Sequence, residues 1–451
     1  MTRTSSRRMV RLARVSALLV GCVVVTTVLM PSRGSTSEPP SAPTIVGQHW
    51  VTGRTLHVDI ATSAFTEPAP VEITFPEGYT SQPDRRWPVT YYLHGANHDQ
   101  TTFRAEYDGE TVTRDYESIV VSPRGVVGFW SDWFNTGQGG PPRYETFVVD
   151  ELIPLVDATY RTIGDRAHRA VMGESMGGFG TLSLAARHPD LFVAAASLSG
   201  AVDSNLPAAQ SVIALAPALQ GGQLNAIFGP RSTQEVVWRG HNPWDLADNL
   251  RDVDLQLFTG TGTYDPAHGE TLAEALGGCG LEGGLIRPMS TSLHERLTTV
   301  GISHRWVALA WGCHGAALFE HEMGLAIARF SRVFGATPPS TFEYRSTEAD
   351  VRVWGWDVRT DSTRATEFLQ LRDVSHGGLT LSGSGTTTVR TPAFFTGRSS
   401  VAVTIDGQRA HVAPDDAGHL TFAVPLGRAN QQQQYRVGSS TPVTTAVVTF
   451  D

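Results

Sequence analysis

Short apolar runs alternate with longer periodic segments from about Thr55 to Phe334. The short runs are bounded by turn residues, which is typical of buried strands. In the longer segments apolar residues recur every three or four positions, which is typical of amphipathic helices. Strands that alternate with helices predict an α/β fold with a mostly parallel sheet. The predicted strands are 56–60, 71–75, 87–93, 119–121, 170–172, 192–196, 255–258 and 306–310, and the predicted helices are 147–160, 176–187 and 317–334.

Two details refine this pattern. Residues 56–60 and 71–75 alternate with period two, so we expect them to open the sheet as an antiparallel pair. Pro154 lies inside the predicted helix 147–160 and should kink it, because proline cannot donate the helical hydrogen bond.

The pattern of apolar and polar residues changes after the Pro-rich segment 336–341, which is typical of a linker. Beyond it, apolar and polar residues alternate with period two, and Asp406-Gly407 lies between two such runs and predicts a hairpin turn. We expect an all-β C-terminal domain at 342–451, a sandwich of about seven strands. It carries no concentrated chemistry, so it could bind carbohydrate or cell wall, or serve only as a packing domain.

The N-terminus has the pattern of an export signal. Five arginines precede an uncharged apolar stretch from Val15 to Ser32, within residues 1–34. An uncleaved membrane anchor and a lipoprotein cleavage box at 19–22 are the alternatives, and each places the folded part outside the cytoplasm, either secreted or associated with the cell envelope. Residues 35–45 are typical of a flexible linker.

Length and composition limit the class of protein. A chain of 451 residues is expected to form two domains, and its 41% hydrophobic and 18% charged residues are typical of a globular protein. The net charge of −9 argues against a nucleic-acid partner. No metal or nucleotide motif is present, so no cofactor is expected. Cys279 and Cys313 could form one disulfide or remain two buried thiols.

The segment 173–177 reads G-E-S-M-G between a predicted strand and a predicted helix. This is the context of a nucleophile elbow, in which flanking glycines allow a sharp turn that exposes a serine at the sheet edge. We therefore predict that Ser175 is a nucleophile rather than an ordinary helix cap. The backbone N–H of Met176 should then be one oxyanion donor, and the second should come from the loop 94–97.

A serine hydroxyl needs a base and a group that orients the base. His314 follows the predicted strand 306–310 and precedes the predicted helix 317–334, which places it at the same sheet edge as Ser175. Position along the chain favours Asp265 as the acid, because it follows the strand 255–258. His94 could contact substrate or hold its own loop by hydrogen bonds.

The region 55–335 resembles the esterase D-like α/β hydrolases, and among them the actinobacterial mycolyltransferase antigens. The similarity is carried mainly by the segment G-F-W-S-D-W at 128–133 and Y-E-T-F at 144–147. The resemblance implies an α/β-hydrolase catalytic domain at 46–335 and oxyanion donors at Ala96 and Met176. It also implies that the acid is Glu282, in a Leu-Glu context upstream of the histidine, with Asp265 second.

If Glu282 orients His314, their loops must touch. Cys279 lies three residues before Glu282 and Cys313 is adjacent to His314. We therefore predict a disulfide between Cys279 and Cys313.

The chain departs from the mycolyltransferases in two places, at 94–97 and at 314–316, so the resemblance by itself does not imply their trehalose and mycolate specificity. The prediction is an exported serine esterase or acyltransferase. Its substrates would be small-molecule, lipid or glycolipid esters, and the protein could associate with a membrane or cell wall. The alternative is a non-catalytic envelope-binding protein on a hydrolase scaffold.

Overall fold

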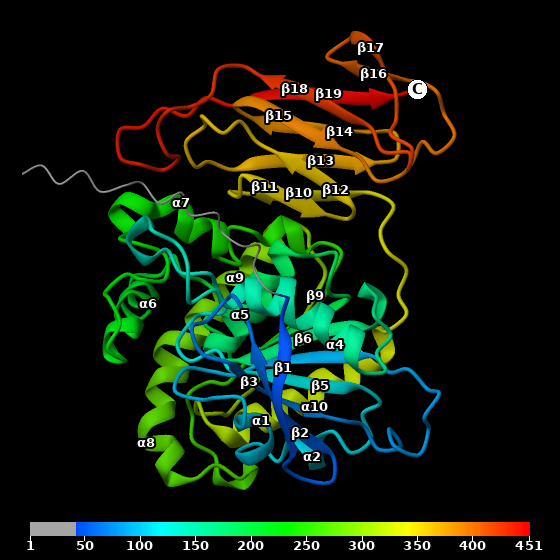
Figure 1. Ribbon diagram of the computed structural model, residues 1–451. Coiled ribbons are helices and arrows are strands. Elements are labelled where there is room, and N and C mark those ends of the chain that lie inside the picture. The colour runs from blue at the N-terminus through cyan, green and yellow to red at the C-terminus, as the bar shows by residue number, and fades with distance from the viewer. Residues whose placement is uncertain (1–41) are drawn as a thin grey trace, which may run out of the picture. The chain divides into compact units, whose positions relative to one another are not determined.

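The structure is a computed structural model that describes residues 42–451 (Figure 1). The predicted export signal at 1–34 and most of the linker at 35–45 lie outside these residues. Within 42–451, no helix is both long and apolar enough to cross a membrane.

Nine strands form one sheet in the order β1-β2-β3-β5-β4-β6-β7-β8-β9. The pairs from β1 to β5 are antiparallel, and the pairs from β5 through β9 are parallel. The predicted α/β class and the antiparallel pair β2–β3 are therefore confirmed, but the pair does not open the sheet, because β1 begins at Thr44, inside the predicted linker, and pairs with β2. The strands are β1 Thr44–Trp50, β2 Thr55–Ala61, β3 Ala69–Thr74, β4 Val89–Leu93, β5 Ile119–Pro123, β6 Arg169–Glu174, β7 Ala194–Leu198, β8 Asp254–Thr259 and β9 His304–Ala308.

Helices cover both faces of the sheet (Figure 1). On β4, Tyr91 packs in one core with α5 and α9, whereas Tyr92 packs in a second core with α10. Neighbouring residues of a strand point to opposite faces, so every residue of the central strands β4, β6 and β7 is buried. The helices are α1 Thr102–Ala105, α2 Gly109–Val112, α3 Tyr144–Thr146, α4 Ile153–Thr159, α5 Met176–Arg187, α6 Pro207–Leu219, α7 Arg231–His241, α8 Leu272–Leu281, α9 Arg287–Thr299 and α10 Ala316–Val333.

The helix predicted at 147–160 is divided. A π-helical turn, η2 Phe147–Leu152, precedes α4, and Pro154 lies in the first turn of α4. The π-helical turn runs directly into α4, where Ile153 N–H donates to Val148 O and Pro154, which has no N–H, follows at the next position. A second π-helical turn, η6 Glu282–Ile286, joins α8 to α9. Four 3₁₀ turns complete the helices: η1 Asn135–Gly137, η3 Arg166–His168, η4 Ala247–Leu250 and η5 Pro266–His268.

The C-terminal region is all-β, as predicted, but it holds more strands than the seven expected. A six-stranded sheet, β10-β13-β14-β19-β16-β17, and a four-stranded sheet, β11-β12-β15-β18, share one hydrophobic core. The predicted hairpin turn at Asp406-Gly407 is confirmed, with positive φ at both residues. The strands are β10 Phe342–Ser346, β11 Asp350–Val353, β12 Trp356–Arg359, β13 Leu369–Ser375, β14 Gly378–Gly383, β15 Gly385–Arg390, β16 Val401–Ile405, β17 Gln408–Val412, β18 Thr421–Leu426 and β19 Thr444–Phe450.

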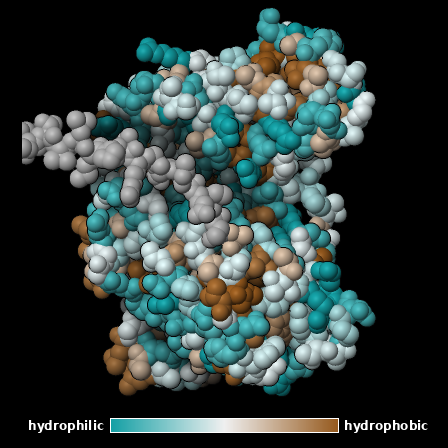
Figure 2. All heavy atoms as spheres, viewed as in Figure 1, coloured by the Kyte–Doolittle hydropathy of each residue, from teal (hydrophilic) through white to brown (hydrophobic). Residues whose placement is uncertain are grey.

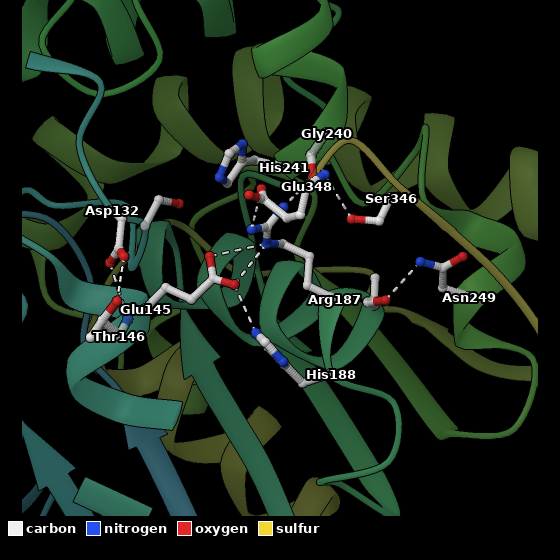
Figure 3. A network of polar contacts seen from close by, with 12 residues as sticks. Asp132, Glu145, Thr146, Arg187, His188, Gly240, His241, Asn249, Ser346 and Glu348 are labelled. Atoms are coloured by element: carbon white, nitrogen blue, oxygen red, sulfur yellow. Dashed lines mark hydrogen bonds and ion pairs between the residues drawn. The ribbon is translucent and has the colours of Figure 1, made fainter. Parts of the chain in front are cut away.

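A buried arginine ends the helix that begins at the elbow (Figure 3). The Arg187 guanidinium donates to both carboxylate oxygens of Glu145 at 2.8 and 3.0 Å, to Gly240 O at 2.8 Å and to Glu348 at 2.9 Å. His188 also contacts Glu145, at 2.7 Å. Burial by itself raises the pKa of Glu145, but the opposite effect of Arg187 and His188 is larger. The pKa of Glu145 therefore lies well below its usual range. The network therefore holds the end of α5 to three other segments.

Removing one partner of this network should destabilise the fold. Glu145→Ala leaves the Arg187 guanidinium buried without its main counter-charge, and we expect a loss of about 3–5 kcal/mol in the free energy of unfolding at neutral pH. The Glu145 carboxyl has a depressed pKa when folded, so the loss should shrink as the pH falls below about 4. Denaturant titrations at several pH values measure both effects.

Glu348→Ala is the matched control. The Glu348 side chain is 49% exposed, against 9% for Glu145, so water screens its pairing with Arg187. We expect a loss of less than about 1 kcal/mol. Equal losses for the two variants would contradict the assignment of Glu145 as the main partner.

Candidate active site

Ser175 lies at a sharp turn between β6 and α5. Its backbone has φ 56° and ψ −117°, a strained region for a non-glycine residue and one that functional sites favour. Its N–H donates to Leu198 O at 3.0 Å. A Cβ at Gly177 would lie 1.8 Å from Leu93 O, so glycine is required for α5 to approach β4. The turn therefore places the serine at the carboxyl edge of the parallel sheet, as predicted.

His314 lies in the loop between β9 and α10. Its Nδ1 contacts Glu282 Oε2 at 2.7 Å, and the two side chains are 7% and 0% exposed. Its Nε2 is buried and has no hydrogen-bond partner within residues 42–451. The pairing leaves this second nitrogen able to accept a proton.

The Glu282 carboxylate is surrounded by donors. Its Oε1 accepts from Ser199 Oγ at 2.9 Å and from Thr259 Oγ1 and Gly260 N at 2.8 Å. Burial by itself raises the pKa of Glu282, but the hydrogen bond from His314 and those from the two hydroxyls lower it below its usual value. The group therefore stays ionised and fixes the His314 ring with Nδ1–H toward it.

Asp265, the second candidate for the acid, pairs elsewhere. Its carboxylate accepts from Ala267 N at 3.0 Å and contacts His268 Nδ1 at 3.0 Å, which caps the short turn η5. Glu282, which directly follows α8, contacts His314 Nδ1 instead. The family resemblance predicted Glu282, whereas position along the chain alone favoured Asp265.

The loop after β4 is held from within. His94 is 1% exposed: its Nδ1 contacts Gly95 O at 2.7 Å and its Nε2 accepts from Gly125 N at 2.7 Å. Burial lowers the pKa of His94, so the ring is neutral. Of the two roles considered for His94, the contacts correspond to holding the loop, because neither ring nitrogen is left for a substrate.

The same loop is tied to the elbow by Glu174. This fully buried carboxylate accepts from Gly95 N at 2.5 Å, from Tyr92 Oη at 2.5 Å and from His98 Nδ1 at 3.0 Å. Within residues 42–451 the next amide, Ala96 N–H, has no hydrogen-bond acceptor. Met176 is the first residue of α5, where helical N–H groups also lack an intrahelical acceptor.

Sequence reasoning missed three polar residues of this site. Glu174 lies inside the elbow motif, and Ser199 and Thr259 lie at the carboxyl ends of β7 and β8. Carboxyl ends of neighbouring parallel strands meet at one sheet edge, where ligands bind in such folds. A search for polar residues directly at these strand ends would have found Ser199 and Thr259.

The predicted disulfide is confirmed. Cys279 and Cys313 are bonded across 34 residues of chain. Gly278 packs against the His314 backbone, where a Cβ would lie 2.5 Å from His314 O, and His314 N donates to Gly278 O at 3.1 Å. The end of α8 is therefore fastened to the histidine loop covalently and by close backbone contact.

Comparison with known proteins identifies the family. A family model described as "Putative esterase" matches residues 62–326, more than half of the chain. The chain belongs to this esterase family. The matched region contains Ser175, Glu282 and His314, and the sequence-based resemblance to the esterase and mycolyltransferase group is confirmed.

Two curated relatives illustrate the similarity. Esterase Rv1288 of Mycobacterium tuberculosis (strain ATCC 25618 / H37Rv) is 30% identical over 203 residues, which cover 44% of this chain and 44% of that protein. Diacylglycerol acyltransferase/mycolyltransferase Ag85B of Mycobacterium leprae (strain TN) is 35% identical over 153 residues, 32% of this chain and 46% of that protein. The chain thus spans less than half the length of these relatives.

Solved structures share the fold. Mycobacterium tuberculosis MPT51 has a TM-score of 0.50 at 20% identity and covers 61% of this chain and 97% of its own. An S-formylglutathione hydrolase from Agrobacterium tumefaciens has a TM-score of 0.50 at 17% identity and covers 64% of this chain and 99% of its own. At this identity the likeness shows the α/β-hydrolase fold alone.

Breaking the disulfide should loosen the histidine loop. For a cross-link spanning 34 residues, chain entropy predicts a loss of about 3–4 kcal/mol in unfolding free energy in the double variant Cys279→Ser/Cys313→Ser. Reductant should destabilise the parent protein by a similar amount and leave the variant unchanged. Iodoacetamide labelling of both cysteines in unreduced, denatured protein would contradict the bond.

Proposed function

We propose that this protein is an exported serine esterase or acyltransferase that acts on carboxylic esters through an acyl-enzyme on Ser175. The contact between His314 Nδ1 and Glu282 Oε2 carries the proposal, because it leaves the opposite ring nitrogen free in a loop at the elbow's sheet edge. The family match supports ester chemistry, and the leader pattern at 1–34 supports export.

Each residue has one role in the proposed reaction. Ser175 Oγ attacks the ester carbonyl while His314 Nε2 takes its proton, and His314 then delivers that proton to the leaving alcohol. Glu282 orients the ring and stabilises its positive charge. The N–H groups of Met176 and Ala96 donate to the oxyanion of the tetrahedral intermediate. A second acceptor, water or an alcohol, releases the acyl group by the reverse sequence.

Exposed apolar side chains support a lipid-like ester as substrate. Figure 2 shows hydrophobic side chains along the edge where α6 and α8 lie in Figure 1. Leu219 on α6 is 82% exposed and Leu276 on α8 is 84% exposed. Because Cys279 bonds α8 to Cys313, the end of this helix lies beside the histidine loop. We further propose that the acyl acceptor is a sugar or lipid alcohol, as in a mycolyltransferase.

Loss of the nucleophile should abolish turnover. Ser175→Ala should lower kcat for short-chain p-nitrophenyl esters by about 10⁴-fold or more, as removal of a triad nucleophile does. A fluorophosphonate probe should label the parent protein on Ser175 and should not label the variant. Equal turnover by the two proteins would contradict the proposed acyl-enzyme on Ser175.

The two candidate acids can be separated by matched amide variants. Glu282→Gln should lower kcat by roughly 10³- to 10⁴-fold with little change in KM, because the His314 ring loses its orientation and its counter-charge. Asp265→Asn should stay within about twofold of the parent, since Asp265 only caps a surface turn. A larger loss from Asp265→Asn than from Glu282→Gln would reverse the assignment.

The acyl acceptor can be measured directly. With a p-nitrophenyl ester of a long fatty acid and added trehalose or glycerol, a transferase forms the new ester, whereas an esterase releases only the free acid. We expect Ser175→Ala to form neither product. Mass spectrometry of the products distinguishes the two activities.

A further inference from the structure

A second carboxyl group lies behind the proposed acid, and neither the sequence motifs nor the reaction uses it. Glu322 lies on α10, is 0% exposed, and places its Oε1 3.0 Å from Ser199 Oγ. The same Ser199 oxygen lies 2.9 Å from Glu282 Oε1. One buried serine hydroxyl therefore joins two buried carboxyl groups.

The number of available protons determines which group donates in each of these two hydrogen bonds. A serine hydroxyl has a single hydrogen, so it can donate to only one of the two carboxyl oxygens. Glu282 is ionised, because it accepts from His314, Thr259 and Gly260. If Glu322 were also ionised, its contact with Ser199 would bring two lone pairs together inside the protein. The contact is satisfied only if the Glu322 carboxyl carries a proton and donates it to Ser199.

The surroundings of Glu322 agree with a neutral group. No cation pairs with it among residues 42–451, and its Oε2 has no hydrogen-bond partner there. An unpaired buried carboxylate is strongly unfavourable, so such a group takes up a proton instead. Burial and the nearby Glu282 charge both hold the pKa of Glu322 well above its usual value.

The other charged groups on elements packed against α10 are engaged elsewhere. On β6, Arg169 pairs with Asp157 and Glu174 is held by the loop after β4. On β8, Asp254 pairs with Arg329.

On β9, Arg305 donates to Gln256 Oε1 at 3.0 Å and to Leu325 O of α10 at 3.1 Å. Glu110 of α2 accepts from Thr55, and β7 carries no titratable residue. Glu282 is thus the charge that acts on Glu322.

We propose that Glu322 is a positioning residue: as a neutral carboxylic acid it donates to Ser199 and commits the Ser199 hydroxyl to Glu282. The hydrogen-bond chain runs from Glu322 through Ser199 and Glu282 to His314. The hydrogen bond from Ser199 fixes the rotamer of Glu282 and stabilises the negative charge of the Glu282 carboxylate. This inference rests on the proposed function for its effect on rate, but the protonation of Glu322 can be tested without it.

Two variants separate hydrogen bonding from packing. Glu322→Gln keeps a neutral side chain with an N–H donor, whereas Glu322→Leu keeps a similar volume and removes the donor. We expect Glu322→Gln to retain most of the parent kcat and Glu322→Leu to lower it about tenfold, each with unchanged KM, for p-nitrophenyl ester turnover. Glu320→Leu, on the same helix without a contact to Ser199, is the control for substitution on α10.

A coupling test uses the bridging serine. Ser199→Ala should lower kcat about as much as Glu322→Leu, and the double variant should be no worse than either single variant, because both remove the same chain. Additive losses, a parent-like kcat for Glu322→Leu, or a Glu322→Gln variant as slow as Glu322→Leu would each overturn the proposal.

The protonation state has its own measurement. An infrared difference spectrum of the parent protein minus Glu322→Gln, at neutral pH, should contain the C=O stretch of a protonated carboxylic acid. A carboxylate band in its place would overturn the proposal, even if the enzyme is active. If the parent shows neither turnover nor labelling of Ser175, the proposed function fails while the infrared result still decides the state of Glu322.

Discussion

The site depends on the hydrogen bonds that the buried Glu282 carboxylate accepts. The carboxylate accepts hydrogen bonds from His314 in the loop before α10, from Ser199 after β7, and from Thr259 and Gly260 at the end of β8. A carboxylate without these donors could not remain ionised inside the protein. The same bonds that keep it charged therefore draw three distant segments to the sheet edge where Ser175 lies.

Buried carboxylates hold both ends of the nucleophile helix. Glu174, next to Ser175, binds the loop that follows β4, and Glu145 binds Arg187 at the last turn of α5. Because each is buried and paired, moving either helix end would leave a charge or a donor unsatisfied. This explains how Ser175 can keep a strained backbone conformation: the surrounding contacts determine where the helix begins and ends.

The histidine loop is fastened by other means. It contains no regular element between β9 and α10, and it is bonded to α8 through Cys279–Cys313 and packed on Gly278. Glu282 directly follows α8, so the disulfide and the Glu282–His314 contact join the same two segments. The covalent bond limits their separation, and the hydrogen bond sets the orientation of the ring.

Local pattern determined a large part of this protein. Apolar runs bounded by turn residues fixed the α/β class, and the glycines around Ser175 fixed the elbow, because only a strand–turn–helix with small residues accommodates that backbone. The cysteine spacing with the family resemblance predicted the disulfide. About seven strands were predicted for the C-terminal region, where ten are present, and two of these, β11 and β12, are only four residues each and too short for a clear alternating pattern. The tertiary structure alone decided that His94 holds its loop, that Asp265 caps a surface turn, and that Glu322 lies behind Glu282. Each of these depends on which groups are buried together, and burial between segments distant in the chain leaves no periodic signal in the sequence.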